Sequence, residues 1–342
     1  MKVLIVKLSA LGDVVQSLPV AMAIRCQAPR AQIDWLVERP SAGLLKGHPA
    51  LDRVLVSPRH QMAEADGLPL TPLTGFGREL RSVRYDAVVD LQGLMKSAIC
   101  VALSRGSRKI GWRGGKEALA AWAYKERMAP FDPDRPALER YLDMLEPLGL
   151  ERPAKVEFGL TPEPAALDAA RALLPGLDGG RPLVVLHPMA KWDSKLWPLA
   201  HWVELAKLLG EQGARLVVSG SGEDAKIGRL IANRAGLGPD LMDLTGRTGL
   251  KELAALLSLA DAVVCTDTGV MHLAAAMGTK VVALFGPTAP WRTGPFGQNH
   301  IILRAGLECS PCFERFCPEL KCMEQISPAQ AAQAASQLVS GR

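Results

Sequence analysis

Short apolar runs alternate along this chain with longer amphipathic or apolar segments. Runs of four to six apolar residues between polar loops are typical of parallel strands buried on both faces, and the longer segments predict helices. This alternation predicts an α/β fold built on parallel sheets. The predicted strands are residues 2–7, 33–38, 53–56, 86–90, 109–112, 183–186, 215–219, 241–244, 262–265 and 281–285.

The clearest strand-to-helix transition lies in residues 262–278, AVVCTDTGVMHLAAAMG. A polar loop of Asp267, Thr268 and Gly269 separates the strand from an apolar helix. The unpaired N–H groups and positive dipole end at the start of a helix attract anions, so this loop predicts a phosphate-binding corner. His272 is the one ionisable side chain on the helix. The alternative is that Asp267 only caps the helix and His272 is a core histidine.

The loop after the first strand, residues 8–13, contains a single glycine, Gly12. The absence of G-x-G-x-x-G argues against a dinucleotide site of the usual kind. Asp13 is placed at the carboxyl edge of the strand, where α/β sheets bind ligands, although it can also serve as a helix cap. Lys96, just past another strand, is a candidate for an acidic ligand group. Residues 60–77 are rich in Pro and Gly and predict a long loop.

The pattern restarts after a proline-punctuated linker at residues 153–164. Lys195 precedes a predicted helix and can reach a diphosphate, or it is an ordinary surface lysine. Glu223 lies in a glycine-rich turn, where it can accept hydrogen bonds from ribose hydroxyls or act as a first-turn helix acid. Thr248 and residues 286–288 (GPT) follow further strands. These loops converge on one edge of a parallel sheet, which predicts a nucleotide-diphosphate site.

Four of the seven cysteines follow the pattern C-x2-C-x4-C-x4-C. Four neighbouring thiolates can hold structural zinc or iron, and reduced or redox-active thiols are the alternative. The residues are Cys309, Cys312, Cys317 and Cys322.

The 342 residues suggest two domains, and a hydrophobic content of 48% is ample for two cores. The net charge of +5, without a Lys/Arg run and with 5% aromatic residues, argues against a nucleic-acid partner. No apolar run approaches the ~18 residues of a membrane span, and the N-terminus does not resemble a signal peptide. We therefore expect a cytoplasmic protein.

Taken together, the motifs resemble the ADP-heptose:lipopolysaccharide heptosyltransferases, most closely the type I enzymes, over nearly the whole chain. Each motif alone is weak, but the set is specific to that family. The motifs are residues 7–14 (KLSALGDV), 90–97 (DLQGLMKS), 195–198 (KLWP), 267–269 (DTG) with His272, and 286–288 (GPT).

The resemblance implies a GT-B architecture, in which two Rossmann-like domains with parallel sheets face a central cleft. Residues 1–160 would then form the acceptor-binding domain, and residues 161–325 the domain that binds the ADP-sugar donor. Residues 326–342 would form a helix that crosses back to the first domain.

The resemblance also assigns roles to residues. Asp13 is expected to be the catalytic base, and the four-cysteine segment departs from the type I pattern. The expected acceptor-binding residues are Ser9, Gly12 and Lys96. The expected donor-binding residues are Lys195, Glu223, Thr248, Asp267, Thr268, Gly269 and His272.

The implied activity is inverting transfer of heptose from ADP-L-glycero-D-manno-heptose to the Kdo of the lipopolysaccharide inner core. The acceptor would be Kdo-lipid A or inner-core lipopolysaccharide, so the enzyme would contact the inner face of the inner membrane peripherally. No cofactor is expected for the chemistry. The alternatives are a transferase of the same fold with another nucleotide sugar or acceptor, as in O-antigen or protein glycosylation, and a non-catalytic nucleotide-binding protein.

Overall fold

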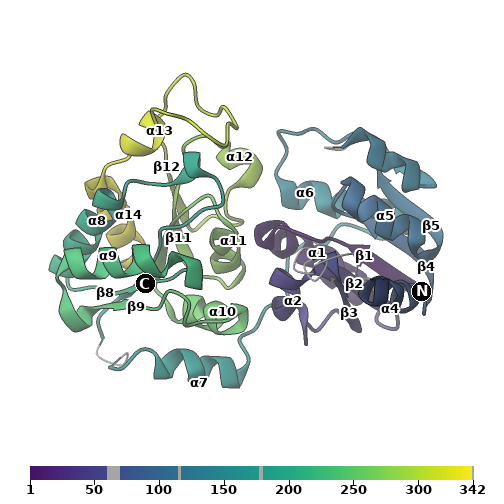
Figure 1. Cartoon of the computed structure of the whole chain (residues 1–342), viewed down its shortest axis with the longest axis horizontal. Coiled ribbons are helices and arrows are strands. Elements are labelled where there is room, and N and C mark those ends of the chain that lie inside the picture. The colour runs from purple at the N-terminus through teal and green to yellow at the C-terminus, as the bar shows by residue number, and fades with distance from the viewer. Residues whose placement is uncertain (60–69, 115–116, 177–179, 341–342) are drawn as a thin grey trace. The chain divides into compact units, whose positions relative to one another are not determined.

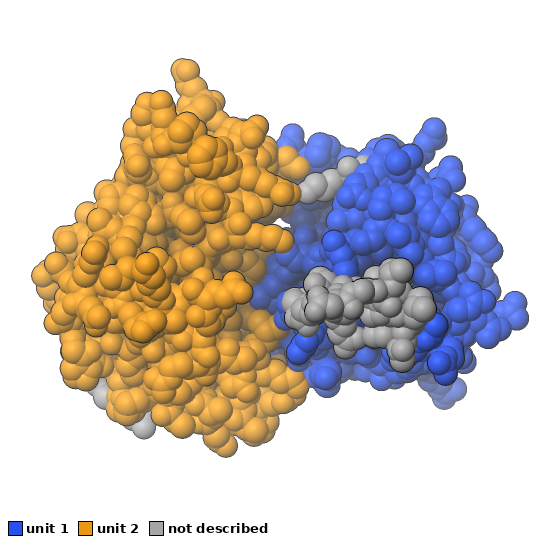
Figure 2. Space-filling model, in the orientation of Figure 1, with its two compact units in different colours: residues 1–160 blue, residues 161–342 orange. Residues whose placement is uncertain are grey.

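The structure is a computed structural model that describes residues 1–59, 70–114, 117–176 and 180–340. It divides into two compact units, Met1–Leu160 and Thr161–Arg342 (Figure 2). Each unit has its own parallel sheet and its own helices.

The first unit is built on a six-stranded sheet in the order β3-β2-β1-β4-β5-β6 (Figure 1). All neighbouring strands in it are parallel. The strands are β1 (Lys2–Val6), β2 (Gln32–Glu38), β3 (Arg53–Ser57), β4 (Arg84–Asp90), β5 (Arg105–Trp112) and β6 (Glu126–Met128). The α-helices are α1 (Leu11–Gln27), α2 (Arg39–Leu45), α4 (Leu70–Leu80), α5 (Met95–Leu103) and α6 (Ala137–Leu142), and the 3-10 helices are η1 (Ala118–Ala123) and η2 (Asp143–Leu148).

Both faces of this sheet are covered, which explains why its central strands are apolar throughout. Alternate residues of β1 enter opposite cores: Val3 and Ile5 pack with α1, α2, α6 and η2, whereas Leu4 and Val6 pack with α5 and η1. The predicted loop at residues 60–77 is wrong over residues 70–77, which belong to α4. Residues 60–69 of that prediction lie outside the described residues.

The second unit has a parallel six-stranded sheet in the order β12-β11-β10-β7-β8-β9. The strands are β7 (Leu183–His187), β8 (Arg215–Val218), β9 (Leu241–Asp243), β10 (Ala262–Thr266), β11 (Lys280–Leu284) and β12 (His300–Leu303). The α-helices are α7 (Pro164–Ala172), α8 (Leu199–Glu211), α9 (Ala225–Ala235), α10 (Leu250–Leu259), α11 (Gly269–Ala276), α12 (Pro290–Thr293), α13 (Lys321–Glu324) and α14 (Pro328–Ser340). The 3-10 helices are η3 (Asp193–Lys195), η4 (Gly222–Asp224) and η5 (Gly238–Asp240).

The last helix, α14, begins with a reciprocal cap: Ser327 N donates to Gln330 Oε1 at 3.0 Å, and Gln330 N donates to Ser327 Oγ at 3.2 Å. It packs on α8 and on β10, β11 and β12, all within the second unit. The return of this helix to the first domain stays a prediction. Among the described residues, no helix is both long enough and apolar enough to cross a bilayer.

Candidate functional site

Each sheet reverses its strand order at one point, between β1 and β4 in the first unit and between β7 and β10 in the second. The loops at the carboxyl ends of these strand pairs diverge to opposite faces of the sheet, which leaves a crevice where α/β proteins bind ligands. The predicted site residues Ser9, Gly12 and Asp13 follow β1, and Lys96 follows β4. Lys195 follows β7 in the same way, and Asp267–Gly269 follow β10.

Asp13 is the third residue of α1, and its side chain is 41% exposed. The hydroxyl of Tyr141, on α6, donates to Asp13 Oδ1 at 2.8 Å, and the Lys7 ammonium lies 3.8 Å from the same oxygen. Asp13 Oδ2 accepts a 3.2 Å hydrogen bond from Ala10 N, so this carboxylate also caps the helix, as the alternative interpretation proposed. A carboxylate has lone pairs for several bonds, so this cap does not exclude the role as a base that is predicted for Asp13.

Lys7 lies fully buried beneath Asp13. Its Nζ donates to Tyr141 Oη at 2.7 Å and to the Leu91 carbonyl at 2.9 Å. Burial lowers the pKa of Lys7, and the charges of Asp13 and Asp90 oppose this shift. Burial also holds the pKa of Tyr141 well above its ordinary value, so the phenol stays a proton donor to Asp13. Lys7, Tyr141 and Asp13 therefore form a directional chain of hydrogen bonds that ends on the carboxylate.

The loops after β1 and β4 are joined through side chains. Gln92 Oε1 accepts hydrogen bonds from the backbone N–H groups of Leu8 and Ser9, at 3.1 and 3.0 Å. Lys96 Nζ donates to Ser9 Oγ at 2.6 Å and to Glu38 Oε1 at 2.9 Å. Ser9 and Lys96 are thus held together across the segments that follow β1 and β4. Asp13 and the buried Gly12 lie in the first turn of α1, directly after Ser9 and Ala10.

A pocket of about 220 Å³ opens beside this cluster. Asp13 and Lys7 line one part of it, and its aromatic walls are Trp112 and Phe131, whose rings meet edge to face at 5.4 Å. Arg140 lies over the Phe131 ring at 4.5 Å and adds a positive charge. The pocket therefore combines a carboxylate, cations and flat apolar walls, which suits a polar, anionic ring-shaped ligand.

In the second unit, Lys195 and Asp267 form an ion pair. Lys195 Nζ lies 2.6 Å from Asp267 Oδ2, also donates to the Asp267 carbonyl at 3.3 Å, and sits 4.5 Å above the Trp192 ring. Both side chains are largely buried, with exposures of 14% and 8%. Asp267 makes no cap bond to α11, whose N-cap is Thr268, so the helix-cap alternative for Asp267 is wrong. Lys195 is not an ordinary surface lysine either.

The first turn of α11 presents its backbone N–H groups at this edge. Thr268 is the N-cap residue, and its side chain makes no capping hydrogen bond. Within the described part of the chain, the buried hydroxyls of Thr266 and Thr288, at the ends of β10 and of the loop after β11, have no hydrogen-bond partner either. Buried hydroxyls are normally satisfied, so these two hydroxyls are available to a polar ligand at this edge. His272 is buried one turn along α11.

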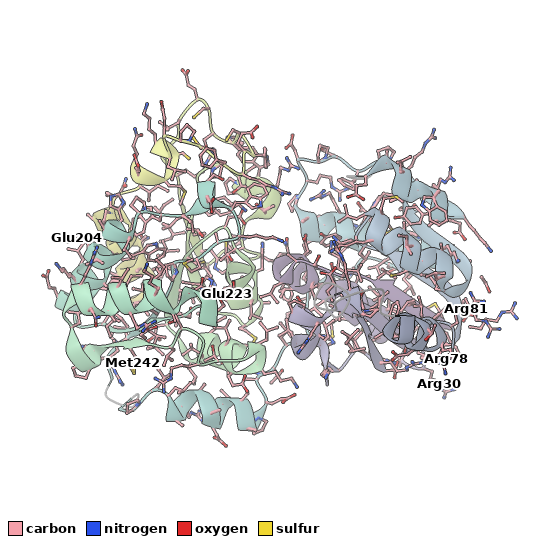
Figure 3. All side chains as sticks on the ribbon, viewed as in Figure 1. Arg30, Arg78, Arg81, Glu204, Glu223 and Met242 are labelled. Atoms are coloured by element: carbon pink, nitrogen blue, oxygen red, sulfur yellow. The ribbon has the colours of Figure 1, made fainter. Side chains whose placement is uncertain are left out.

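The turns after β8 and β9 lie backbone against backbone. Gly246 adopts φ +72°, and a Cβ there would lie 2.8 Å from Gly222 Cα. Gly246 N also donates to the Gly220 carbonyl at 2.9 Å. In the β8 turn the cap acid is Asp224, which accepts hydrogen bonds from Ser221 N and Oγ, both at 2.7 Å. The neighbouring carboxylate, Glu223, is exposed (Figure 3). Thr248, half-buried, lies just before α10.

His187 ends β7 and is fully enclosed in the second unit. Its Nδ1 lies 3.0 Å from Ser219 Oγ, at the end of β8. Burial lowers the pKa of His187 to about 4, while Asp224 and the hydrogen bond to Ser219 act in the opposite direction. The imidazole is therefore neutral near pH 7 and serves as a hydrogen-bonding group rather than a charge.

The predicted metal site is not supported. All four cysteines are free thiols, and Cys309 and Cys312 are exposed. The pKa of Cys322 is raised, by burial first and then by the three other thiols. No group of three or more His, Cys, Asp or Glu side chains among the described residues has an arrangement that could hold a metal ion. The segment instead contacts the Lys195 loop, where Ser194 Oγ donates to the Glu314 carbonyl at 2.6 Å.

Sequence reasoning missed several residues of these sites. Lys7 and Gln92 lie within quoted motifs but received no role, because their function depends on which loops the sheet brings together. Tyr141 carries no sequence signal, since 128 residues separate it from Asp13. Thr288 was included only through its GPT motif, and His187 received no role.

The comparisons with known proteins identify the family of this chain. The model of glycosyltransferase family 9 (heptosyltransferase) matches residues 73–323. The chain belongs to this family. It is therefore a glycosyltransferase, and the resemblance found in its motifs is confirmed.

Lipopolysaccharide heptosyltransferase 1 of Pseudomonas aeruginosa is 34% identical over 93% of this chain and 87% of the relative. Lipopolysaccharide heptosyltransferase 1 of Escherichia coli K12 is 32% identical over 90% of this chain and 95% of the relative. The solved structure of E. coli heptosyltransferase WaaC with ADP matches with a TM-score of 0.81 at 28% identity, covering 99% of this chain and 100% of that one. The fold is accordingly GT-B, as predicted.

Proposed function

We propose that this glycosyltransferase moves heptose from ADP-L-glycero-D-manno-heptose to the Kdo of the lipopolysaccharide inner core. The similarity to lipopolysaccharide heptosyltransferases 1 and to WaaC, solved with ADP and with an ADP-2-deoxy-2-fluoro heptose, supports this donor and acceptor. The observation that carries the proposal is the Asp13 carboxylate, held by Tyr141 and Lys7 at the edge of a pocket with aromatic walls.

On the acceptor side, Asp13 acts as the general base. As the acceptor hydroxyl loses its proton to Asp13, its oxygen forms a bond to the anomeric carbon of heptose. The bond between that carbon and the phosphate oxygen breaks, and ADP leaves with the electron pair. A single displacement of this kind inverts the configuration. Lys96, Ser9 and the backbone at Gly12 orient the acceptor, and the cations of this unit suit the carboxylate of Kdo.

On the donor side, negative charge grows on the departing diphosphate. Lys195, the Thr268 hydroxyl and the backbone N–H groups at Gly269 and Val270 stabilise that charge. An ammonium has three N–H donors, and the Lys195 hydrogen bonds described above are both to Asp267, which fixes the lysine in place.

The remaining donor contacts are assigned by position. Glu223 accepts hydrogen bonds from the ribose hydroxyls, and Thr248 lies on the adjoining turn. Asp267 orients Lys195, and His272 supports the loop from within α11. Because Kdo-lipid A is anchored in a bilayer, the proposal includes peripheral contact between the enzyme and the membrane that holds its acceptor.

The test is a donor screen with Kdo-lipid A as acceptor, in which ADP-heptose is compared with ADP-glucose, UDP-glucose and GDP-mannose. We expect heptosylated product from ADP-heptose alone. Asp13→Asn should lower the rate by roughly 10²- to 10⁴-fold while ADP binding, measured by calorimetry, stays the same. Product from another nucleotide sugar would replace the donor assignment, and an unchanged rate in Asp13→Asn would remove the base assignment. ADP binding without any transfer would favour a non-catalytic nucleotide-binding protein.

A further inference from the structure

An apolar surface lies on the outer faces of α5 and η1, which pack against each other in the first unit. Their inward residues, such as Val101 and Ala123, enter the core of that unit. Their outward residues are large and hydrophobic yet exposed: Ile99 (50%), Leu103 (47%), Leu119 (77%) and Trp122 (56%). We call these four residues the apolar face. Large apolar side chains gathered in this way mark an interaction surface, whereas isolated ones do not.

Cations border the apolar face at the carboxyl end of α5. Arg81 Nη1 donates to the Leu103 carbonyl at 3.1 Å, and Lys109 Nζ donates to the Ala102 carbonyl at 2.7 Å. Lys125 follows η1 and donates to the Ser107 carbonyl at 3.2 Å. Figure 3 shows Arg81 at the periphery of the first unit.

These three side chains use their hydrogen bonds on carbonyl oxygens rather than carboxylates. Among the described residues, no Asp or Glu lies within ion-pair distance of Arg81, Lys109 or Lys125. The Lys109 pKa is lowered, by partial burial first and then by the charges of Lys125 and Arg81, because both cations lie near Lys109. The border of the apolar face therefore carries positive charge that the described part of the protein does not neutralise.

We propose that the apolar face and its cationic border form the surface with which the enzyme docks on an anionic lipid bilayer. Trp122, Leu119, Ile99 and Leu103 enter the interface between headgroups and acyl chains, while Arg81, Lys109 and Lys125 contact lipid phosphates. Trp and Leu on an apolar face beside basic residues are the composition of interfacial membrane-binding elements. The positive charge of the border favours a lipid bilayer over a second protein as the partner, because an anionic bilayer offers negative charge over an extended surface.

This docking surface rests on the proposed function and extends it. Lys96, Ile99 and Leu103 are spaced i, i+3 and i+7, which places them on one side of α5. Lys96 is an acceptor-side residue, hydrogen-bonded to Ser9. A helix rises 1.5 Å per residue, so Leu103, the apolar-face residue of α5 that is farthest from Lys96, lies only about 10 Å from it along the helix. A sugar acceptor attached to a lipid in the docked bilayer is therefore within reach of the loops that carry Ser9 and Asp13.

The experiment is co-sedimentation of the full chain with vesicles of phosphatidylethanolamine and phosphatidylglycerol (70:30), and with pure phosphatidylcholine vesicles. The wild type should bind the anionic vesicles, and binding should weaken as salt is added. Leu119→Ser/Trp122→Ser and Arg81→Gln/Lys125→Gln should each lower the bound fraction roughly tenfold. The matched controls are Phe316→Ser, a 72% exposed aromatic residue of the second unit, and Lys207→Gln/Lys226→Gln on α8 and α9. They should bind as the wild type does.

The proposal would be overturned if the wild type does not bind anionic vesicles. It would also be overturned if Phe316→Ser loses vesicle binding while Leu119→Ser/Trp122→Ser keeps it. Self-association of the wild type that Trp122→Ser abolishes, without vesicle binding, would assign the face to a contact between copies and overturn the lipid assignment. Vesicle binding is measured without substrate, so it does not depend on the donor or the base. Transfer to a water-soluble Kdo acceptor should be unchanged in both surface variants. If the wild type transfers no heptose to this soluble acceptor, the proposed function is refuted, but the vesicle-binding result still supports the docking surface.

Discussion

The Tyr141 hydroxyl accepts a hydrogen bond from the buried Lys7 ammonium and donates one to the Asp13 carboxylate, at 2.7 and 2.8 Å. Lys7 thus acts on Asp13 both directly, across 3.8 Å, and through the phenol. The Tyr141 hydroxyl, polarised by the Lys7 ammonium, donates to the Asp13 carboxylate. This bond fixes the orientation of the carboxylate before any substrate binds. A base held in this way loses little entropy when the reaction begins.

Replacing Tyr141 by Phe tests this relationship. The variant removes the donor to Asp13 and leaves Lys7 with one acceptor fewer. Hydrogen bonds to charged groups contribute about 1.5–3 kcal/mol, so we expect kcat/KM to fall by about 10- to 100-fold. The acid limb of the pH–rate profile should move to higher pH, because the ionised carboxylate loses a donor that favours it.

A matched control is Tyr85→Phe. Tyr85, on β4, donates to Asp34 Oδ2 at 2.6 Å in the core of the same unit, so this variant removes a similar buried Tyr–Asp hydrogen bond away from the pocket. It should lower stability without changing the pH–rate profile. If both variants shift the profile equally, or neither does, Tyr141 has no positioning role.

Lys195→Met tests the donor side. Loss of the ammonium should weaken ADP binding at least ~10-fold, because a charge-assisted contact to phosphate disappears. The single variant also leaves Asp267 buried without its cation, which costs about 3–5 kcal/mol of stability. Lys195→Met/Asp267→Asn removes both charges together and should recover much of that stability while ADP binding stays weak.

Calorimetric titration with ADP and thermal unfolding measure the two effects separately. Lys191→Met, an exposed lysine of the same loop, is the control and should bind ADP normally. ADP affinity equal to that of the wild type in the double variant would show that Lys195 has only a structural role in the ion pair.

His187 predicts a specific pH dependence of stability. Its folded pKa of about 4 lies below the ordinary value of 6.5, so between these pH values the unfolded chain binds a proton that the folded chain does not. Stability should therefore be complete above pH 6.5 and fall on acidification toward pH 4, by ~3 kcal/mol for this group. NMR titration should place the imidazole midpoint near 4, and the assigned signal should vanish in His187→Gln. A midpoint near 6.5 would contradict the burial argument.

The sequence predicted the strands well because buried parallel strands are apolar on both faces, and such runs stand out. It predicted the loop residues of the second unit for the same reason: once the strands are placed, Asp267, Lys195 and Glu223 must lie at one edge of the sheet. The helix over residues 70–77 was missed because its proline and two glycines resemble a loop, whereas Phe76 and Leu80 of α4 pack into the core of the first unit.

Contacts between residues that are far apart in the chain could not be predicted from the sequence. No spacing rule joins Asp13 to Tyr141, and nothing local shows that Lys7 is buried, because a lysine after a strand is usually exposed. The cysteine spacing suggested a metal, but spacing does not fix where thiols point, and the described arrangement lacks a ligand group. The sequence also left open that Lys195 is a surface lysine and that Asp267 is a helix cap. The structure shows instead that the two side chains form one buried ion pair.

Two glycine variants separate the effect of left-handed backbone strain from the effect of the close contact between Gly246 and Gly222. In Gly246→Ala the new Cβ would meet Gly222 Cα at 2.8 Å, and φ +72° adds a left-handed penalty of ~1 kcal/mol. In Gly236→Ala, at φ +68°, a Cβ meets no heavy atom of the described chain within 4 Å, so only the left-handed penalty applies. Both variants should unfold at lower temperature, Gly246→Ala more so. Only Gly246→Ala should also weaken ADP binding, because it displaces the turn that presents Glu223. Calorimetry that finds equal ADP affinity in the two variants would show that this turn does not contact the nucleotide.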